Sequence, residues 1–218
     1  MNTVLFDMDG TLLNTLDDLH ASINFALGQS GLEEVSCDEA RLAAGYGSVV
    51  LIEMVGKGKL QKGTPQFQRV FDDFSNHYRQ HCNDATRPYP GIMELLAALK
   101  DRGIRMAVVS NKVQPETERL RKLWFGEFIE LAIGRREGVA PKPDPAMAQA
   151  ALSELCTAPK DAIFIGDSQP DVQTGKNAGC VSVGCTWGFR SREVLEHEHA
   201  DYIIDRPEQL LGIIDMIG

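Results

Sequence analysis

The sequence predicts an α/β fold, in which a doubly wound parallel sheet carries an inserted all-helical domain. Short β-branched runs alternate with helical patterns over most of the chain, which is typical of a parallel sheet with helices on its faces. This alternation stops between residues 15 and 87, where only helical patterns occur. A chain of 218 residues is long enough for one large core and one small inserted domain. We therefore expect two modules of unequal size.

Six short apolar runs are the expected strands of the sheet. Each is rich in β-branched residues and ends in polar residues, as buried strands do. They lie at residues 3–6, 104–109, 129–133, 162–165, 181–185 and 202–204. Because helical patterns separate these runs, neighbouring strands are expected to run parallel.

Helices with clear start and stop signals lie between these strands. Apolar residues recur at i, i+3, i+4 and i+7 over residues 92–99, and Gly103 is expected to end that helix. The same spacing recurs over residues 148–155, where the preceding Asp144 and Pro145 are typical of a helix start. A third apolar helix is expected at the end of the sequence.

Residues 15–87 are expected to form a helical cap domain, and residues 1–14 and 88–218 the core that carries it. The apolar stripe of the first cap helix is formed by Leu16, Leu19, Ile23, Ala26 and Leu27. Further helical patterns lie on either side of a loop at residues 56–63, which contains three lysines. Two interpretations of this loop stay open: its lysines reach a second anionic group of a substrate, or they are solvated.

Composition and charge argue against several classes of protein. The formal net charge of −9 disfavours binding to nucleic acid or anionic lipid. No apolar run is long enough to cross a bilayer, and no export signal is visible. The five cysteines show no CxxC spacing, so neither a disulfide framework nor a zinc site is expected. These features indicate a cytoplasmic protein that binds neither nucleic acid nor membranes.

Polar residues stand where the predicted strands end, and ligands of an open parallel sheet bind beyond these carboxyl ends. The residues concerned are Asp7, Asp9, Ser110, Asn111, Lys112, Asp167 and Asp171. Lys142 stands just ahead of a predicted helix and is expected to join them on one rim of the sheet. Lys112 is expected to point to solvent instead. Residues 187–190 follow another strand end, and we expect them to pack mainly through their aromatic rings.

The acids Asp7, Asp167 and Asp171 are candidate metal ligands. Crowded carboxylates raise one another's pKa unless a cation intervenes, and carboxylate oxygens are hard ligands that Mg²⁺ prefers. Asp167 lies at a strand exit and Asp171 in the first turn of the next helix, so both can face one ion. The sequence therefore predicts a magnesium site.

The remaining polar groups suit phosphoryl transfer, in which catalysis is mostly positioning and neutralisation of phosphate charge. The hydroxyl of Ser110 and the backbone N–H of Asn111 can hold phosphoryl oxygens. Lys142 supplies compensating positive charge. Together with the acids, these groups indicate chemistry on a phosphate ester.

The four segments resemble the four motifs of the haloacid dehalogenase-like hydrolases, in the same order. The resemblance is greatest to the phosphoglycolate phosphatase-like branch, which also has a helical cap after its first motif. The segments that carry it are Ser110-Asn111-Lys112, Lys142-Pro143-Asp144-Pro145 and Gly166-Asp167-Ser168. The resemblance covers essentially the whole chain and implies a Rossmann-like core. One small departure is Asn14, where relatives commonly carry Asp.

The resemblance also implies a role for each acid. Asp7 is expected to be the nucleophile, and Asp9 the general acid and base. The main-chain carbonyl of Asp9 and the side chain of Asp167 are expected to bind the metal. Asp171 is expected to bind it through water or to support Lys142, which binds phosphate as Ser110 does.

The activity that the resemblance implies is a magnesium-dependent phosphatase, acting on a small phosphorylated metabolite through an aspartyl-phosphate. Phosphoglycolate is the leading candidate substrate, and the chain is expected to be a monomer or homodimer. Alternatives are a sugar phosphomutase or pyrophosphatase of the same family, or a non-catalytic binding protein on this fold. A mutase typically places a cap histidine where Leu19 stands. His20 is one residue later, which rotates it by about 100° on a helix.

Overall fold

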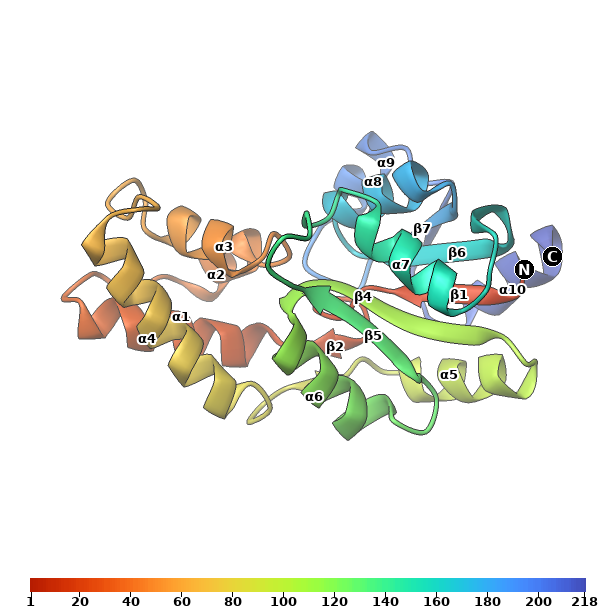
Figure 1. Cartoon of the computed structure of the whole chain (residues 1–218), viewed down its shortest axis with the longest axis horizontal. Coiled ribbons are helices and arrows are strands. Elements are labelled where there is room, and N and C mark those ends of the chain that lie inside the picture. Colours follow the sequence, from red (N-terminus) through yellow and green to blue (C-terminus); the bar gives the residue numbers. More distant parts are fainter. The chain divides into compact units, whose positions relative to one another are not determined.

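The chain forms two units, a core unit and a helical unit. The computed structural model describes residues 1–218 (Figure 1). The core unit comprises Met1–Leu13 and Pro88–Gly218, and the helical unit comprises Asn14–Arg87. Two short strands, β2 (Leu13–Asn14) and β3 (Arg87–Pro88), pair where the chain leaves and re-enters the core unit.

The core unit is built on a six-stranded sheet with the order β5-β4-β1-β6-β7-β8. All neighbouring strands are parallel, which confirms the predicted fold class. The strands are β1 (Thr3–Phe6), β4 (Arg105–Val113), β5 (Leu131–Arg135), β6 (Ala162–Gly166), β7 (Val181–Cys185) and β8 (Tyr202–Ile204). Strand β1 lies between β4 and β6, so its carboxyl end is flanked by theirs.

Two strands differ from the prediction by more than one residue. Strand β4 does not end at Val109 but continues to Val113, and its register with β5 shifts between these two residues. The polar residues Ser110, Asn111 and Lys112 are buried within the strand. The sequence predicts that the strand ends before them. Strand β5 begins only at Leu131, because the N–H and C=O of Ile129 bond to the preceding helix instead.

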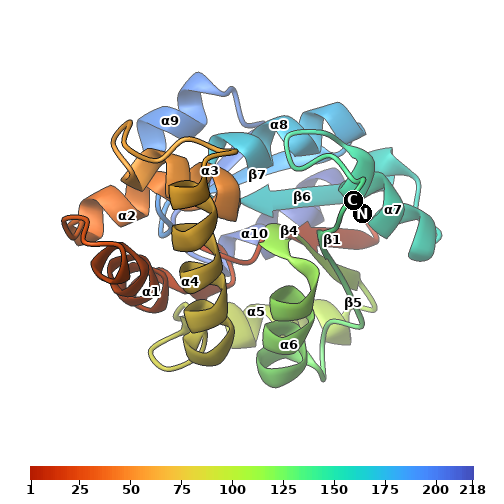
Figure 2. The same cartoon turned by 60° about the vertical axis from the view of Figure 1, so that its left-hand side comes forward.

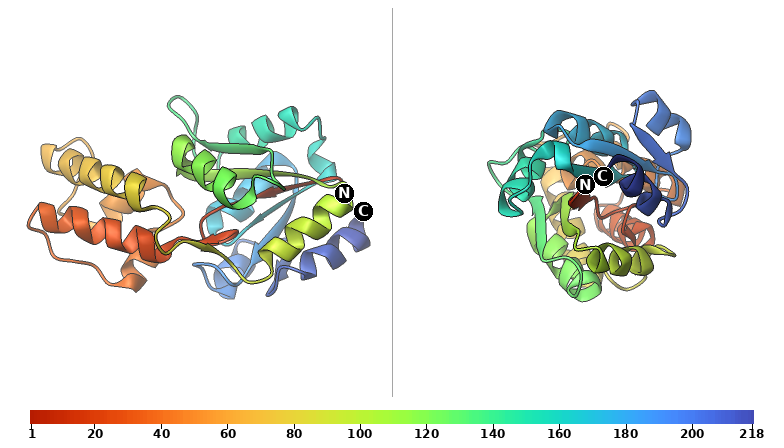
Figure 3. Two further views of the ribbon diagram at one scale, coloured as in Figure 1. Left: turned by 90° about the horizontal axis from the view of Figure 1, so that it is seen from below. Right: turned by 90° about the vertical axis from the view of Figure 1, so that its right-hand side faces the viewer.

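Helices cover both faces of this sheet, as the right panel of Figure 3 shows. They are α5 (Ile92–Asp101), α6 (Gln114–Phe125), α7 (Ala146–Glu154), α8 (Gln169–Ala178), α9 (Arg192–His197) and α10 (Gln209–Ile217), with a 3₁₀ turn at Pro159–Asp161. Helices α7 and α8 lie on one face and α5 and α6 on the other (Figure 2). None of the helices combines the length and the hydrophobicity that a membrane span requires.

The core between the sheet and α7 is made of small and aliphatic side chains. Leu5 and Ala107 of the sheet pack with Met147, Ala148 and Ala151 of the helix, and all five are at most 1% exposed. Burying these side chains stabilises the sheet by the usual hydrophobic contribution of about 25 cal/mol per Å². This packing holds the strands, and therefore the residues at their ends, in fixed positions.

The helical unit consists of α1 (Leu16–Gln29), α2 (Cys37–Ala43), α3 (Ser48–Val55) and α4 (Pro65–His81). Ser36 and Glu39 form a capping box at the start of α2. In the loop at residues 56–63, Nζ of Lys57 lies 2.5 Å from Oε1 of Glu39, so one of its three lysines is engaged within the unit. That this unit acts as a cap, and that its loop reads a substrate, stay predictions.

Candidate active site

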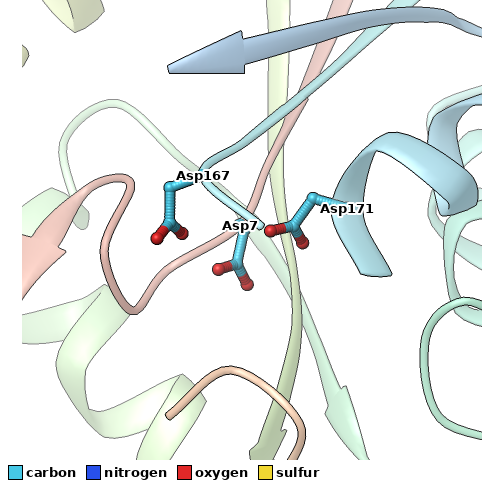
Figure 4. Close-up of side chains that lie close together, drawn as sticks. All are labelled: Asp7, Asp167 and Asp171. Atoms are coloured by element: carbon cyan, nitrogen blue, oxygen red, sulfur yellow. The ribbon is translucent and has the colours of Figure 1, made fainter. Parts of the chain in front are cut away.

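Three aspartates meet at the carboxyl edge of the sheet. Asp7 directly follows β1, Asp167 directly follows β6, and Asp171 lies in the first turn of α8. A carboxylate oxygen from each lies within 4.8 Å of the others, and all three side chains are buried (Figure 4). Because β1 and β6 are parallel neighbours, their ends bring the first two acids together.

Burial and mutual repulsion disfavour the charged forms of these acids. Burial and the neighbouring charges of Asp171 and Asp9 together raise the pKa of Asp7 to about 7, although Lys142 opposes this rise. The pKa of Asp167 is held well above its ordinary value by burial and by the charges of Asp171 and Asp7. The cluster therefore favours an additional cation that would keep its carboxylates ionised.

Lys142 is the buried cation that directly neutralises two of the acids. Its Nζ lies 2.6 Å from Oδ1 of Asp7 and 2.6 Å from Oδ1 of Asp171, and it also donates to the carbonyl of Val109 at 3.1 Å. Burial opposes its charge, but the two carboxylates raise its pKa above the ordinary lysine value. Lys142 therefore stays an ammonium ion at the edge of the acid cluster.

Asn111 positions Lys142 through its side-chain amide. The N–H of Lys142 donates to Oδ1 of Asn111 at 2.8 Å, and Nδ2 of Asn111 donates to the carbonyl of Lys142 at 3.3 Å. This reciprocal pair ties strand β4 to the segment before α7. The amide side chain thus has a structural task, besides the phosphate contact predicted for its backbone N–H.

Asp171 is fixed by the loop that begins α8. The backbone N–H of Ser168 donates to Oδ2 of Asp171 at 3.0 Å, and the Ser168 hydroxyl donates to the same oxygen at 2.5 Å. Oδ1 of Asp171 is left for Lys142. The two oxygens of this carboxylate therefore have separate tasks, one in the loop and one in the acid cluster.

Asp167 is held by groups that the sequence does not reveal as functional. The hydroxyl of Thr11 donates to Oδ1 at 3.2 Å, and the backbone N–H of Phe189 donates to Oδ2 at 2.7 Å. Gly188 packs so closely that a Cβ atom there would collide with Asp167 and with the carbonyl of Gly10. Residues 187–190 therefore do more than the predicted aromatic packing. Every residue type except proline offers a backbone N–H, so no sequence signal marks this contact.

Lys112 does not point to solvent, and that prediction was wrong. Its side chain is 5% exposed, and its Nζ lies 3.0 Å from Oδ1 of Asp9. The register of β4 shifts between Val109 and Val113, so the regular alternation of a strand does not extend over residues 110–112. No sequence signal therefore places the side chain of Lys112 in the site.

Ser110 is oriented by the backbone of Lys112. Its Oγ accepts a hydrogen bond from the N–H of Lys112 at 3.3 Å, and the side chain is buried. The hydroxyl oxygen is thus used as an acceptor, and its proton stays available for an oxygen of a ligand. This arrangement suits a phosphoryl oxygen.

The donor set and the charge of the site fit Mg²⁺. Three carboxylates at this spacing offer the hard oxygen ligands that Mg²⁺ prefers, without nitrogen or sulfur donors in the cluster. The buried charges of the site belong to the acids Asp7, Asp9, Asp167 and Asp171 and to the cations Lys112, Lys142 and Arg190. With all four acids ionised, their charges against the three positive ones leave a net charge of −1. A divalent cation would make the site positive toward a phosphate.

Comparison with known proteins agrees with this geometry. A sequence profile of the haloacid dehalogenase-like hydrolases matches residues 4–185. The chain is 30% identical over 216 residues to a phosphoglycolate phosphatase of Aquifex aeolicus, covering 99% of this chain and 97% of that one. It is 31% identical over 217 residues to an N-acetylmuramic acid 6-phosphate phosphatase of Pseudomonas aeruginosa, covering 99% and 95%.

A solved structure shows the same fold over nearly the whole length. It is that of a predicted phosphoglycolate phosphatase from Haemophilus somnus, with a TM-score of 0.89 at 30% identity, and the match covers 98% of this chain and 97% of that one. The family profile itself spans well over half of the sequence. The chain therefore belongs to the haloacid dehalogenase-like hydrolase family, in its branch of phosphatases related to phosphoglycolate phosphatase.

Proposed function

We propose that this protein is a Mg²⁺-dependent phosphatase that hydrolyses a small phosphomonoester through an aspartyl-phosphate on Asp7. The observation that carries the proposal is the meeting of Asp7, Asp167 and Asp171 at one edge of the sheet, where Lys142 contacts the first and the last of them. Mg²⁺ would be held by these acids and by the main-chain carbonyl of Asp9. When bound, it supplies positive charge that keeps the carboxylates ionised and polarises a phosphoryl oxygen.

In the first step, a carboxylate oxygen of Asp7 attacks the phosphorus and the bond to the ester oxygen breaks. Asp9 gives its proton to the leaving oxygen, so an alcohol departs rather than an alkoxide. The Ser110 hydroxyl and the Asn111 backbone N–H donate to phosphoryl oxygens, and Lys142 balances their charge. The Asp9 carboxyl group is buried, and its Oδ1 lies 3.0 Å from Nζ of Lys112, so the protein holds it beside the other residues of the site.

In the second step, Asp9 takes a proton from a water molecule, and the resulting hydroxide attacks the phosphorus. The bond between phosphorus and the Asp7 oxygen breaks, so inorganic phosphate leaves and Asp7 is restored as a carboxylate. Asp9 ends the cycle protonated, as it began. One residue thus acts as acid and then as base.

Phosphoglycolate is the leading candidate substrate, which is supported by relatives of that name at about 30% identity over nearly the whole chain. A second candidate, N-acetylmuramic acid 6-phosphate, is supported by the relative from Pseudomonas aeruginosa at 31% identity. Both compounds carry a carboxylate besides the phosphate. We further propose a cytoplasmic monomer or homodimer that acts on free metabolites and binds no nucleic acid, in keeping with the net charge of −9.

The side chain of His20 disfavours the mutase alternative. Its Nε2 lies 2.8 Å from the carbonyl of Val35 and 3.0 Å from Nδ2 of Asn24, all within the helical unit. A histidine that is held in this way supports the fold of its own unit. The geometry therefore favours hydrolysis over transfer of phosphate to a second sugar hydroxyl.

The test is release of inorganic phosphate from a panel of phosphomonoesters that includes phosphoglycolate and sugar acid phosphates. We expect turnover with Mg²⁺, no turnover in excess chelator, and poor replacement by Ca²⁺, which tolerates higher coordination numbers. Asp7→Asn should be inactive toward every ester, because an amide is a poor nucleophile. Asp101→Asn, on an exposed surface of the same unit, is the matched control and should keep full activity. Full activity in chelator, or in Asp7→Asn, would rule the proposal out.

A further inference from the structure

Lys112 is a buried cation that the proposed steps do not use. Its side chain is 5% exposed, and the Asp9 side chain that it pairs with is 12% exposed. Burying an ammonium ion costs free energy unless a charged partner compensates it, and a surface lysine would have avoided that cost. Its burial beside the reacting groups therefore calls for a function there.

The backbone of Lys112 fixes where its side chain begins. Its N–H donates to the Ser110 hydroxyl oxygen at 3.3 Å, and its carbonyl accepts from the Thr117 hydroxyl at 3.1 Å. A Cβ atom at the neighbouring Gly134 would also press on this carbonyl. The side chain thus starts beside the residue proposed to bind phosphate and ends at the residue proposed to protonate the leaving oxygen.

The position of Asp9 defines which part of a substrate lies near Lys112. A general acid lies about 2.6–3.2 Å from the oxygen that it protonates. A carboxylate on the carbon next to that oxygen lies three bonds away, or about 3 Å. Because Nζ of Lys112 is 3.0 Å from Oδ1 of Asp9, such a carboxylate falls within reach of the ammonium group.

We infer that Lys112 is a specificity-determining residue that binds a carboxylate on the carbon adjacent to the ester oxygen. The inference rests on the proposed function, because it takes Asp9 as the acid for the leaving group. The contact with Asp9 shows that Nζ pairs with a carboxylate oxygen at 3.0 Å, the kind of group that the inference assigns to it. The substrate class is therefore the phosphate esters of 2-hydroxy acids, and a sugar phosphate with a remote carboxylate lies outside it.

The test compares two substrates of equal size, phosphoglycolate and its neutral amide, in the wild type and in Lys112→Met. A hydrogen bond to a charged group contributes roughly 1.5–3 kcal/mol, so kcat/KM for phosphoglycolate should fall about 10- to 100-fold more than kcat/KM for the amide. Lys112→Arg should retain most of the preference for phosphoglycolate. Lys122→Met, which alters an exposed lysine of α6, is the control and should change neither value.

The outcomes separate this inference from the proposed function. Equal losses for both substrates in Lys112→Met would show that Lys112 acts only through Asp9, and would overturn the inference. If Lys112→Met does not fold, the inference is tested on the wild type alone. The wild type should have a higher kcat/KM for phosphoglycolate than for its amide, and than for the phosphate ester of the 3-hydroxy acid that has one more methylene group. A wild type that hydrolyses all three equally contradicts the inference alone. A wild type that hydrolyses no phosphate ester contradicts the proposed function itself.

Discussion

The ionisation of Asp7 is subject to opposing electrostatic effects. Its carboxyl group is buried and lies near Asp171 and Asp9, which disfavour its ionised form, while Lys142 at 2.6 Å favours it. A nucleophile must be ionised, so the fold holds Asp7 in a state that a metal ion would complete. The cost of this arrangement should be visible in the stability of the metal-free protein.

Metal-free stability should fall with rising pH because of Asp7. Its pKa is near 3.8 when unfolded and about 7 when folded, so between these values the folded state holds the additional proton. Stability then declines with pH by up to about 1.4 kcal/mol per pH unit. Asp7→Asn has no carboxyl group to titrate at this position, so its stability lacks this pH dependence. The free energy of unfolding of Asp7→Asn minus that of the wild type should therefore increase from pH 4 to pH 7 and then level off. Denaturant titrations in chelator measure it, and a constant difference over this range would contradict the assigned pKa.

At the scale of elements, the segment after β7 acts as a support for the acid cluster. The N–H of Phe189 holds one oxygen of Asp167, and Gly188 leaves room for that side chain. Asp167 follows β6, and the segment that supports it follows the neighbouring strand β7. The position of Asp167 therefore depends on the close approach of two loops.

Gly188→Ala should weaken metal binding without unfolding the protein. The added methyl group would displace Asp167, and losing the alignment of one ligand or its partner typically costs about 10- to 100-fold in metal affinity. Titration calorimetry with Mg²⁺ measures this directly. Gly212→Ala is the matched control, because its Cβ would meet nothing within 4 Å and should leave the affinity unchanged. Unchanged affinity in Gly188→Ala would show that the segment does not support the metal ligand.

The elements also show what the sequence could and could not predict. The apolar runs of β1, β7 and β8 gave correct boundaries, because their burial follows from hydrophobicity alone. The end of β4 was misplaced because polarity at residues 110–112 resembles a strand end, although these side chains are buried by their contacts in the site. Such burial depends on partners that are distant in sequence.

At the scale of the whole molecule, the topology accounts for why distant residues gather. Parallel strands end at one edge, so Asp7 and Asp167 meet although 160 residues separate them, a closeness that the strand-end rule predicts. The pairing of Lys112 with Asp9 could not be predicted in this way, because the ends of long side chains are placed by packing. The catalytic roles follow from the combined arrangement of these groups, so their test must follow the whole reaction.

The most direct test of the proposed chemistry is a rapid-mixing experiment on Asp9→Asn. This variant keeps the nucleophile but lacks the acid and the base, which usually contribute about 10²–10⁴-fold each. A nitrophenolate leaves without a proton, so nitrophenyl phosphate should still phosphorylate Asp7 and then stall, whereas an alkyl phosphate should scarcely react. We expect a burst near one equivalent of nitrophenolate per active site, with labelled phosphate trapped on the protein. Equal loss of alkyl and aryl esters without any phosphoprotein would contradict the account.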